Sequence, residues 1–324
     1  MPDHGAEAGI VDVVPRPRKV SPVRIVDAHH HLWIPERRDP DLGYGWLRDV
    51  GAPKPFGDPT PIQRDYEWPE FAAESGAHAL AGSVHVQTDN AVDPVAETAW
   101  VQSVFDATGL DHAIVGLADL ASEGLPDLLD AHARHRAFRG VRQILSRLDD
   151  DPARSFAPRH LLRDPAWRAG YASLAARGLS FDLQLYPEQM TEAAEFLADH
   201  PDVPVIVDHA GSPHDRTEAG LALWRDGTAR LAALGDRVSI KLSGFGMFAP
   251  GWTADSVRPL VAHLLERFGP ARTMWGSNFP VDSLMASYDH GIEAIAACLD
   301  GLGEADRDSV MGGTARRVYR LGES

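Results

Sequence analysis

Short apolar segments rich in β-branched residues recur at intervals of a few tens of residues along the chain. Segments of this kind between turn signals are typical of buried strands. Most are followed by a longer segment whose apolar residues have helical spacing. The pattern predicts eight strands, at residues 24–28, 81–86, 113–117, 139–144, 179–185, 203–208, 237–242 and 272–275.

Two of the intervening helices have clear signals. Residues 188–199 carry apolar side chains at the i, i+3, i+4 and i+7 positions of one helix face. A second helix is predicted to start after Thr253, whose hydroxyl suits an N-cap, and to end at Gly269 and Pro270. Strands that alternate with helices indicate an α/β protein with a parallel sheet.

The number of strands favours a (β/α)8 TIM barrel over an open doubly wound sheet, and no glycine-rich dinucleotide motif follows any strand. We predict one barrel domain at residues 23–324, after a flexible N-terminal extension at residues 1–22. An insertion at 33–76, after the first strand, is dense in Pro, Gly, Tyr and Trp. It could be a lid or pocket wall, or a surface insertion packed by its own aromatic side chains.

The amino-acid composition argues against several classes of function. Hydrophobic residues make up 44% and charged residues 24%, as in globular proteins, and 31 Lys and Arg against 47 Asp and Glu give a net charge of −16. So acidic a chain, with no basic patch or long apolar run, is expected to bind neither nucleic acid nor membrane. The one cysteine, Cys298, excludes an intramolecular disulfide and suits a reducing, cytoplasmic location. With 15 histidines, any metal site would use imidazole and carboxylate ligands.

The strongest local signal is the sequence Asp-Ala-His-His-His-Leu-Trp, which ends the first predicted strand. Because side chains alternate along a strand, His29 and His31 share one face while His30 points to the other. In a barrel the carboxyl ends of the strands form the active-site rim. We therefore expect His29 and His31 to converge on a metal ion or a substrate oxygen.

A second signal, Val-Asp-His-Ala-Gly, ends the sixth predicted strand and brings His209 to the same rim. Asp208 has the opposite parity and is expected to face the helix layer. The three histidines His29, His31 and His209 could bind zinc or polarise a carbonyl group without a metal.

Further polar residues lie at other strand ends. Arg142 could hold a substrate carboxylate with two parallel hydrogen bonds, or form an internal salt bridge with Asp182. Asn278 follows the eighth strand, and Asp282 could supply a carboxylate there. Residues assigned to substrate binding are Arg142, Gln87, Asp182, Gln184, Lys241 and Trp33, and Asn278 and Asp282 join the histidines as catalytic candidates.

These motifs together resemble the amidohydrolase-related family, which includes sugar-acid lactonases, sulfomuconolactonase and pyrone-dicarboxylate lactonase. The resemblance covers nearly the whole chain from residue 23 to residue 321. It depends on an ordered series of strand-end motifs, which read Asp-Ala-His-His-His-Leu-Trp, Phe-Asp-Leu, Asp-His-Ala-Gly, Lys-Leu-Ser-Gly, Trp-Gly-Ser-Asn-Phe-Pro and Gly-Gly-Thr-Ala.

The resemblance implies a barrel hydrolase in which a carboxylate at the eighth strand, sometimes with zinc, activates water. His29 and His31 match the family's first-strand pair, and His209 matches its sixth-strand histidine. At the eighth strand the family usually has Gly-Ser-Asp-Trp-Pro, whereas this chain has Asn278 in place of the aspartate. Asp282 could take over the role, Asp182 could do so, or the chemistry differs from hydrolysis.

We therefore expect hydrolysis of a small lactone or related ester, and the substrate could be anionic. The histidines, with or without zinc, would stabilise the oxyanion, Asp282 would deprotonate water, and Arg142 or Lys241 would hold the substrate. One alternative is a zinc-dependent decarboxylase or hydratase. Another, favoured by Asn278, is a non-hydrolytic isomerase, cyclase or ligand-binding barrel. The protein could also form a homo-oligomer.

Overall fold

The computed structural model describes residues 24–36, 42–52, 54–76, 78–89 and 93–323. The predicted extension at residues 1–22 lies outside them. The described strands form a single sheet of eight parallel strands in sequence order. Their bounds are β1 Arg24–His30, β2 Ala79–Val86, β3 Asp111–Leu117, β4 Phe138–Arg142, β5 Ser180–Leu183, β6 Val205–Val207, β7 Val238–Leu242 and β8 Thr273–Trp275.

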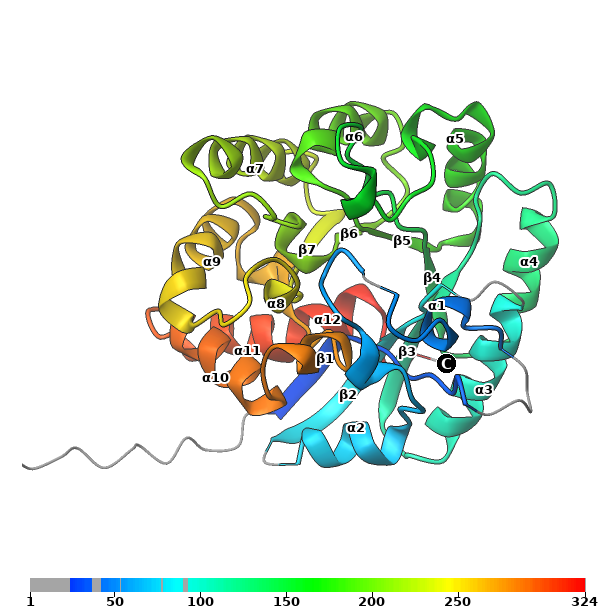
Figure 1. Ribbon diagram of the computed structural model, residues 1–324, viewed down its shortest axis with the longest axis horizontal. Helices are drawn as coiled ribbons and strands as arrows, with labels where there is room; N and C mark the ends of the chain where they lie inside the picture. The colour runs from blue at the N-terminus through cyan, green and yellow to red at the C-terminus, as the bar shows by residue number, and fades with distance from the viewer. Residues whose placement is uncertain (1–23, 37–41, 53, 77, 90–92, 324) are drawn as a thin grey trace, which may run out of the picture.

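The sheet curls into a nearly closed barrel, which confirms the predicted (β/α)8 architecture (Figure 1). Each predicted strand overlaps an observed one, although β1 continues to His30 and β6 is shorter than expected. The ring is completed just beyond β8, where His30 pairs with Phe279 and the His31 amide donates to the Phe279 carbonyl over 2.7 Å.

The helices surround the barrel on its outside (Figure 1). Among the described residues, none of them combines the length and the apolar character that crossing a bilayer requires. Their bounds are α1 Gly45–Arg48, α2 Trp68–Glu74, α3 Pro94–Asp106, α4 Leu125–His132, α5 Pro165–Ala172, α6 Met190–Ala198, α7 Glu218–Ala232, α8 Phe245–Phe248, α9 Ala254–Phe268, α10 Tyr288–Cys298, α11 Glu304–Asp308 and α12 Thr314–Val318.

The two helices with clear sequence signals are confirmed. The helix predicted at 188–199 is α6, preceded by the short 3-10 turn Pro187–Gln189. The side chain of Thr253 caps α9 by accepting a hydrogen bond from the Ser256 amide over 3.3 Å. The last residue of α9 is followed by Gly269, whose φ of 71° is a left-handed value that glycine adopts without strain.

The inside of the barrel is filled with side chains. One buried apolar cluster combines small and branched residues of the strands with Ala315 of α12 and with Tyr319, which follows that helix. The last helix therefore closes the amino end of the barrel, and the opposite end is left for chemistry. The strand residues of this cluster are Val26, Ala28, Val84, Val86, Ala113, Val115, Ile206 and Met274.

The insertion after β1 contributes a wall to the carboxyl end of the barrel. The indole of Trp33 stacks on the His31 ring, with centroids 5.8 Å apart and planes 15° apart. The Trp46 ring meets Trp33 edge-on at 5.6 Å, and Phe56 stacks on Phe156 beyond β4. Both interpretations of the insertion therefore hold in part for its described residues, since Trp33 borders the histidines and Trp46 packs on Trp33 within the insertion.

Candidate active site

The consecutive histidines of β1 divide between the two faces of the strand, as predicted. The ring of His30 stacks on Phe71 of α2, with centroids 4.1 Å apart. The rings of His29 and His31 lie 5.1 Å apart on the other side. The β1–β2 pairing shifts register between Asp27 and His30, and this irregularity brings His29 to the inner face next to Ala28.

His209 joins this pair, with its ring centroid 4.6 Å from that of His29. Strand β6 ends at Val207, and both His209 and Ala210 have a φ of 53°, a left-handed value that is costly for residues with a side chain. The neighbouring Gly244 leaves room for this turn, because a Cβ there would lie 2.6 Å from His209 Nδ1. The predicted convergence of the three histidines is confirmed.

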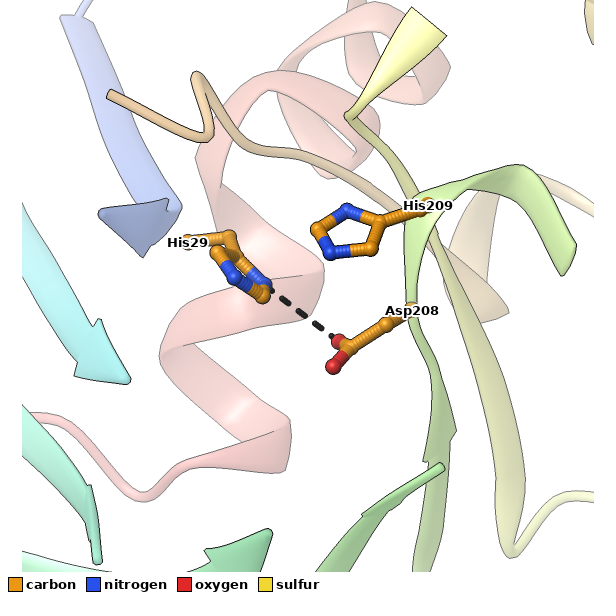
Figure 2. Close-up of side chains that lie close together, drawn as sticks. All are labelled: His29, Asp208 and His209. Atoms are coloured by element: carbon orange, nitrogen blue, oxygen red, sulfur yellow. Dashed lines mark ion pairs between the residues drawn. The ribbon is translucent and has the colours of Figure 1, made fainter. Parts of the chain in front are cut away.

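The orientation expected for Asp208 is wrong. Asp208 lies inside the barrel, and its Oδ1 is 3.3 Å from Nδ1 of His29 (Figure 2). Ile206, two residues earlier, belongs to the apolar cluster inside the barrel, so alternation along β6 brings Asp208 to the same face. The left-handed turn then points His209 inward as well, which simple alternation does not allow.

A lysine lies at the centre of the buried charges. Lys241 Nζ is 2.5 Å from Asp182 Oδ2 and 3.0 Å from Asp208 Oδ1, and all three side chains are fully buried. The Tyr319 hydroxyl also donates to Asp182, over 2.7 Å. Burial raises the pKa of Asp182 to about 6, against the attraction of Lys241. Burial acts in the same direction on Asp208, but Lys241, His29 and His209 together outweigh it and hold the pKa well below its usual range.

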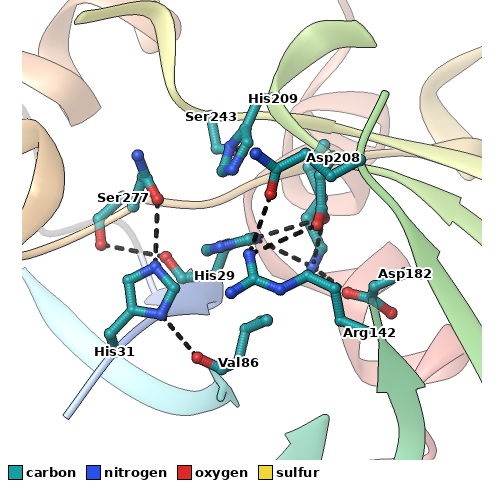
Figure 3. A network of polar contacts seen from close by, with 12 residues as sticks. His29, His31, Val86, Arg142, Asp182, Asp208, His209, Ser243 and Ser277 are labelled. Carbon is teal, nitrogen blue, oxygen red and sulfur yellow. Dashed lines mark hydrogen bonds and ion pairs between the residues drawn. The ribbon is translucent and has the colours of Figure 1, made fainter. Parts of the chain in front are cut away.

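Arg142 lies beside this group (Figure 3). Its guanidinium donates to Gln184 Oε1 over 3.2 Å and to the Gln87 carbonyl over 2.8 Å. The carboxylate paired with it is that of Asp208, at 4.0 Å, whereas Asp182 pairs with Lys241. Among the described residues, the structure therefore does not contain the ion pair considered between Arg142 and Asp182. Arg142 pairs with Asp208 instead, and Asp182 pairs with Lys241.

Asn278 lies beside both His31 and Asp282. The His31 Nδ1 atom lies 2.6 Å from the Val86 carbonyl, which can only accept, so the ring proton is on Nδ1 and Nε2 carries a lone pair. Asn278 Oδ1 lies 3.4 Å from that Nε2, and its Nδ2 donates to Asp282 Oδ1 over 3.0 Å. Burial raises the pKa of Asp282 to about 7. Asp282 therefore lies next to the Asn278 amide, and its carboxyl group is half ionised at a pH of about 7.

Burial keeps the three histidines uncharged. It lowers the pKa of His29 and of His31 well below the usual value, and it lowers that of His209 to about 4. Nearby cations act in the same direction, Lys241 on His29 and Arg142 on His31. Neutral imidazoles can donate or accept a hydrogen bond or bind a metal, but they cannot neutralise an anion.

The comparison with known proteins agrees with this arrangement. A family model described as Amidohydrolase matches residues 26–321. The chain belongs to the amidohydrolase family. It is 37% identical over 303 residues to the uncharacterized protein y4mH of Sinorhizobium fredii, and the match covers 93% of this chain and 100% of that protein. The resemblance stated from the strand-end motifs is confirmed.

Other amidohydrolase relatives carry more informative names. An L-fucono-1,5-lactonase of Burkholderia multivorans is 32% identical over 309 residues, covering 92% of this chain and 96% of that protein. A crystal structure of a Burkholderia multivorans amidohydrolase with bound zinc superposes with a TM-score of 0.75 at 30% identity, covering 92% of this chain and 99% of that one. These relatives support an enzyme with a hydrolase-like, lactonase-like role.

The donors that could hold a metal in this amidohydrolase are His29, Asp208 and His209. Their ligand atoms lie within 4.8 Å of one another, and imidazole with carboxylate is a donor set that suits zinc. However, Lys241 Nζ lies 3.0 Å from Asp208 Oδ1 and 3.3 Å from His29 Nδ1. A cationic group already contacts two of the three donors, so the charges around this site do not fit a divalent ion.

Sequence reasoning missed two members of the site. Asp208 could have been found by counting alternate positions from Ile206 within the apolar strand. Tyr319 could not, because it reaches Asp182 from the far end of the chain, after the last helix. Ser243, which follows β7 directly, contacts His209 Nδ1 over 3.1 Å.

Proposed function

We propose that this amidohydrolase opens a small, anionic lactone or related ester by water attack on its carbonyl carbon. The observation that carries the proposal is the meeting of three neutral histidines in one buried centre at the carboxyl end of the barrel. Neutral imidazoles in a dry site are suited to stabilise an oxyanion as it develops. Similarity to the L-fucono-1,5-lactonase supports a cyclic ester as substrate.

Carbonyl polarisation is assigned to the histidines nearest the buried charges. His29 and His209 have ring centroids 4.6 Å apart, so one oxygen atom could receive hydrogen bonds from both. Arg142 would hold the anionic group of the substrate, because it is a buried cation paired with a carboxylate only at 4.0 Å. Trp33 would form an apolar wall beside His31.

Water activation is assigned to Asp282, with His31 and Asn278 as orienting groups. His31 Nε2 is an acceptor, so a water molecule could donate one proton to it and the other to Asp282, whose carboxylate accepts from Asn278 Nδ2 over 3.0 Å. A general base works best with a pKa near the working pH. The pKa of Asp282, about 7, meets that condition, whereas the pKa of His31 is well below 6.5.

The proposed step balances without a metal or another reactant. The water oxygen bonds to the carbonyl carbon, Asp282 takes one proton, and the oxyanion forms against the histidines. The ring carbon–oxygen bond then breaks, and the proton on Asp282 passes to the departing alkoxide. The product is an open-chain hydroxy acid, and the carboxylate of Asp282 is restored.

The test is proton release by the purified protein with aldonolactones and muconolactones. We expect Asp282→Asn to lower kcat by about a hundredfold or more, as loss of a general base does. The exposed Asp300→Asn variant is the matched control and should keep full activity. An inactive wild type would refute the lactonase proposal, and full activity in Asp282→Asn would refute the role of Asp282.

One observation favours a second candidate, a non-hydrolytic isomerase or cyclase. Asn278 has its oxygen toward His31 at the place where the family usually has an aspartate base. In Asn278→Asp a carboxylate would stand beside His31 directly. If lactone hydrolysis appears only in that variant, the natural protein uses its histidines for another reaction.

A further inference from the structure

The ammonium group of Lys241 has three polar atoms around it. They are Asp182 Oδ2 at 2.5 Å, Asp208 Oδ1 at 3.0 Å and His29 Nδ1 at 3.3 Å. An ammonium has three N–H donors and no lone pair, so it can donate to Asp182 and His29 while its charge pairs with Asp208. The side chains of Lys241, Asp182 and Asp208 are fully buried, and this centre is therefore closed to bulk water.

We propose that Lys241 is the built-in cation of this centre: its ammonium takes the place of a divalent metal and holds His29 with the ring proton on Nε2. This role adds to the proposed hydrolysis. It rests on the proposed function only in that the Nε2 proton would be donated to the lactone substrate. Nothing in the family match or in the named relatives assigns a part to this lysine.

Charge balance supports the first half of the proposal. The ion-pair network joins two cations, Lys241 and Arg142, to two carboxylates, Asp182 and Asp208, so their charges cancel. A divalent ion beside Asp208 would leave two uncompensated positive charges in a dry centre. It would also lie within a few ångströms of the ammonium, where screening is weak and the repulsion is large.

Hydrogen-bond direction supports the second half. Lys241 can only donate, so the Nδ1 atom that it faces must accept, and the proton of neutral His29 must be on Nε2. Among the described residues this buried Nε2 has no hydrogen-bond partner. It is therefore free to donate to a substrate oxygen, as an oxyanion-binding group must.

Asp208 is the competing partner of Nδ1, because its Oδ1 is also 3.3 Å away and would favour a proton there. The lysine contact has hydrogen-bond geometry, whereas neither Asp208 oxygen has a hydrogen-bond partner within the described part of the chain. A proton on Nδ1 would also face an ammonium proton. The geometry therefore selects the Nε2–H form.

The first test is zinc affinity, measured by isothermal titration calorimetry with zinc alone and by metal analysis after dialysis. We expect wild type to bind zinc weakly and Lys241→Met, which keeps the length but removes the charge, to bind at least about tenfold tighter. Lys241→Arg, which keeps the charge, and Lys54→Met, which removes a lysine elsewhere, should resemble wild type. Tight stoichiometric zinc in wild type, with no gain in Lys241→Met, would overturn the proposal.

The second test needs no variant of Lys241 and so survives a failure of Lys241→Met to fold. Long-range ¹H–¹⁵N spectra of wild type, with His29 assigned from the signal lost in His29→Gln, report which ring nitrogen is protonated. Protonated Nε2 supports the proposal, and protonated Nδ1 overturns it. Neither test uses turnover, so an inactive wild type would refute the lactonase while leaving this result intact.

Discussion

Two sets of buried histidines lie around the same strands and have different roles, one in the proposed active site and one in the scaffold. The inner histidines, His29, His31 and His209, meet at the carboxyl end of the barrel. The outer histidines, His30, His85, His112 and His132, lie between the barrel and its helices. Every outer ring has a hydrogen-bonding side chain as a partner, namely Ser83 for His30 and His112, Glu97 for His85 and Thr98 for His132.

The comparison shows that burial alone does not identify a catalytic histidine. Burial lowers the pKa of His112 and His132 to about 4, as it does for His209 in the inner set. The difference is in the contacts. The outer rings are bound by the Ser83, Glu97 and Thr98 side chains of the scaffold. His29 instead lies against the buried charges of Lys241 and Asp208.

The largest effect is expected from breaking an outer contact. His85 Nε2 lies 2.9 Å from Glu97 Oε1, and its Nδ1 accepts from the Leu32 amide, all in the protein interior. His85→Leu would leave a buried carboxylate without this partner, which should lower the free energy of unfolding by about 3–5 kcal/mol. Chemical denaturation measures this. The folded fraction should keep its activity per molecule, and a loss below about 1 kcal/mol would contradict the assigned role.

The inner set should respond in the opposite way. His29→Gln removes the Nε2 donor, while the Gln oxygen can still accept from Lys241. We expect kcat/KM for lactone hydrolysis to fall about a hundred- to a thousandfold, equivalent to about 2.7–4 kcal/mol of transition-state stabilisation. Unfolding should change little. If His29→Gln instead mainly unfolds the protein and retains activity, the two sets do not differ as proposed.

A milder change tests the outer set again. The Ser83 hydroxyl lies 2.8 Å from His30 Nε2 and 2.9 Å from His112 Nδ1, so it joins two rings. Ser83→Ala should lower the free energy of unfolding by about 2 kcal/mol, because both rings lose this partner. Steady-state kinetics should match wild type. A changed KM would show that the outer network reaches the substrate.

The alternation of hydrophobic and polar positions predicts much of this arrangement. Eight strand signals fix the barrel, and the strand-end rule brings His29, His31 and His209 to one rim. It also separates His30 from its neighbours, which is the boundary between the two sets of histidines. These inferences succeed because they depend on local periodicity and on a general property of parallel barrels.

The rest depends on contacts that periodicity does not contain. The register shift in β1 and the left-handed turn at His209 change which side chains point inward, and neither has a clear sequence signal. The wrong orientation for Asp208 came from counting from His209, whose own direction is set by that turn. Asp182 of β5 accepts hydrogen bonds from Lys241 of β7 and from Tyr319 near the end of the chain, and only the closed barrel brings these residues together.

The smallest effect, the pH dependence, also separates the two sets. Asp282 titrates with a pKa of about 7 and touches the inner set through Asn278. As a base it must be ionised, so kcat/KM should rise about tenfold from pH 6 to pH 8 and then level off. Rate profiles measure this. The same rise is expected in Ser83→Ala, whereas the residual rate of Asp282→Asn should not follow it.

Stability should change in the opposite direction over the same range. Because burial raises the folded-state pKa of Asp282 above its unfolded value, the folded protein binds the extra proton between the two values. The free energy of unfolding should therefore fall as the pH rises from about 4 through about 7, and Asp282→Asn should remove that part of the decrease. Denaturation at several pH values would show it. Ionisation of Asp282 is thus expected to raise the activity and to lower the stability, as for a carboxylate held in place for catalysis. An identical stability profile in Asp282→Asn would show that the raised pKa belongs to another group.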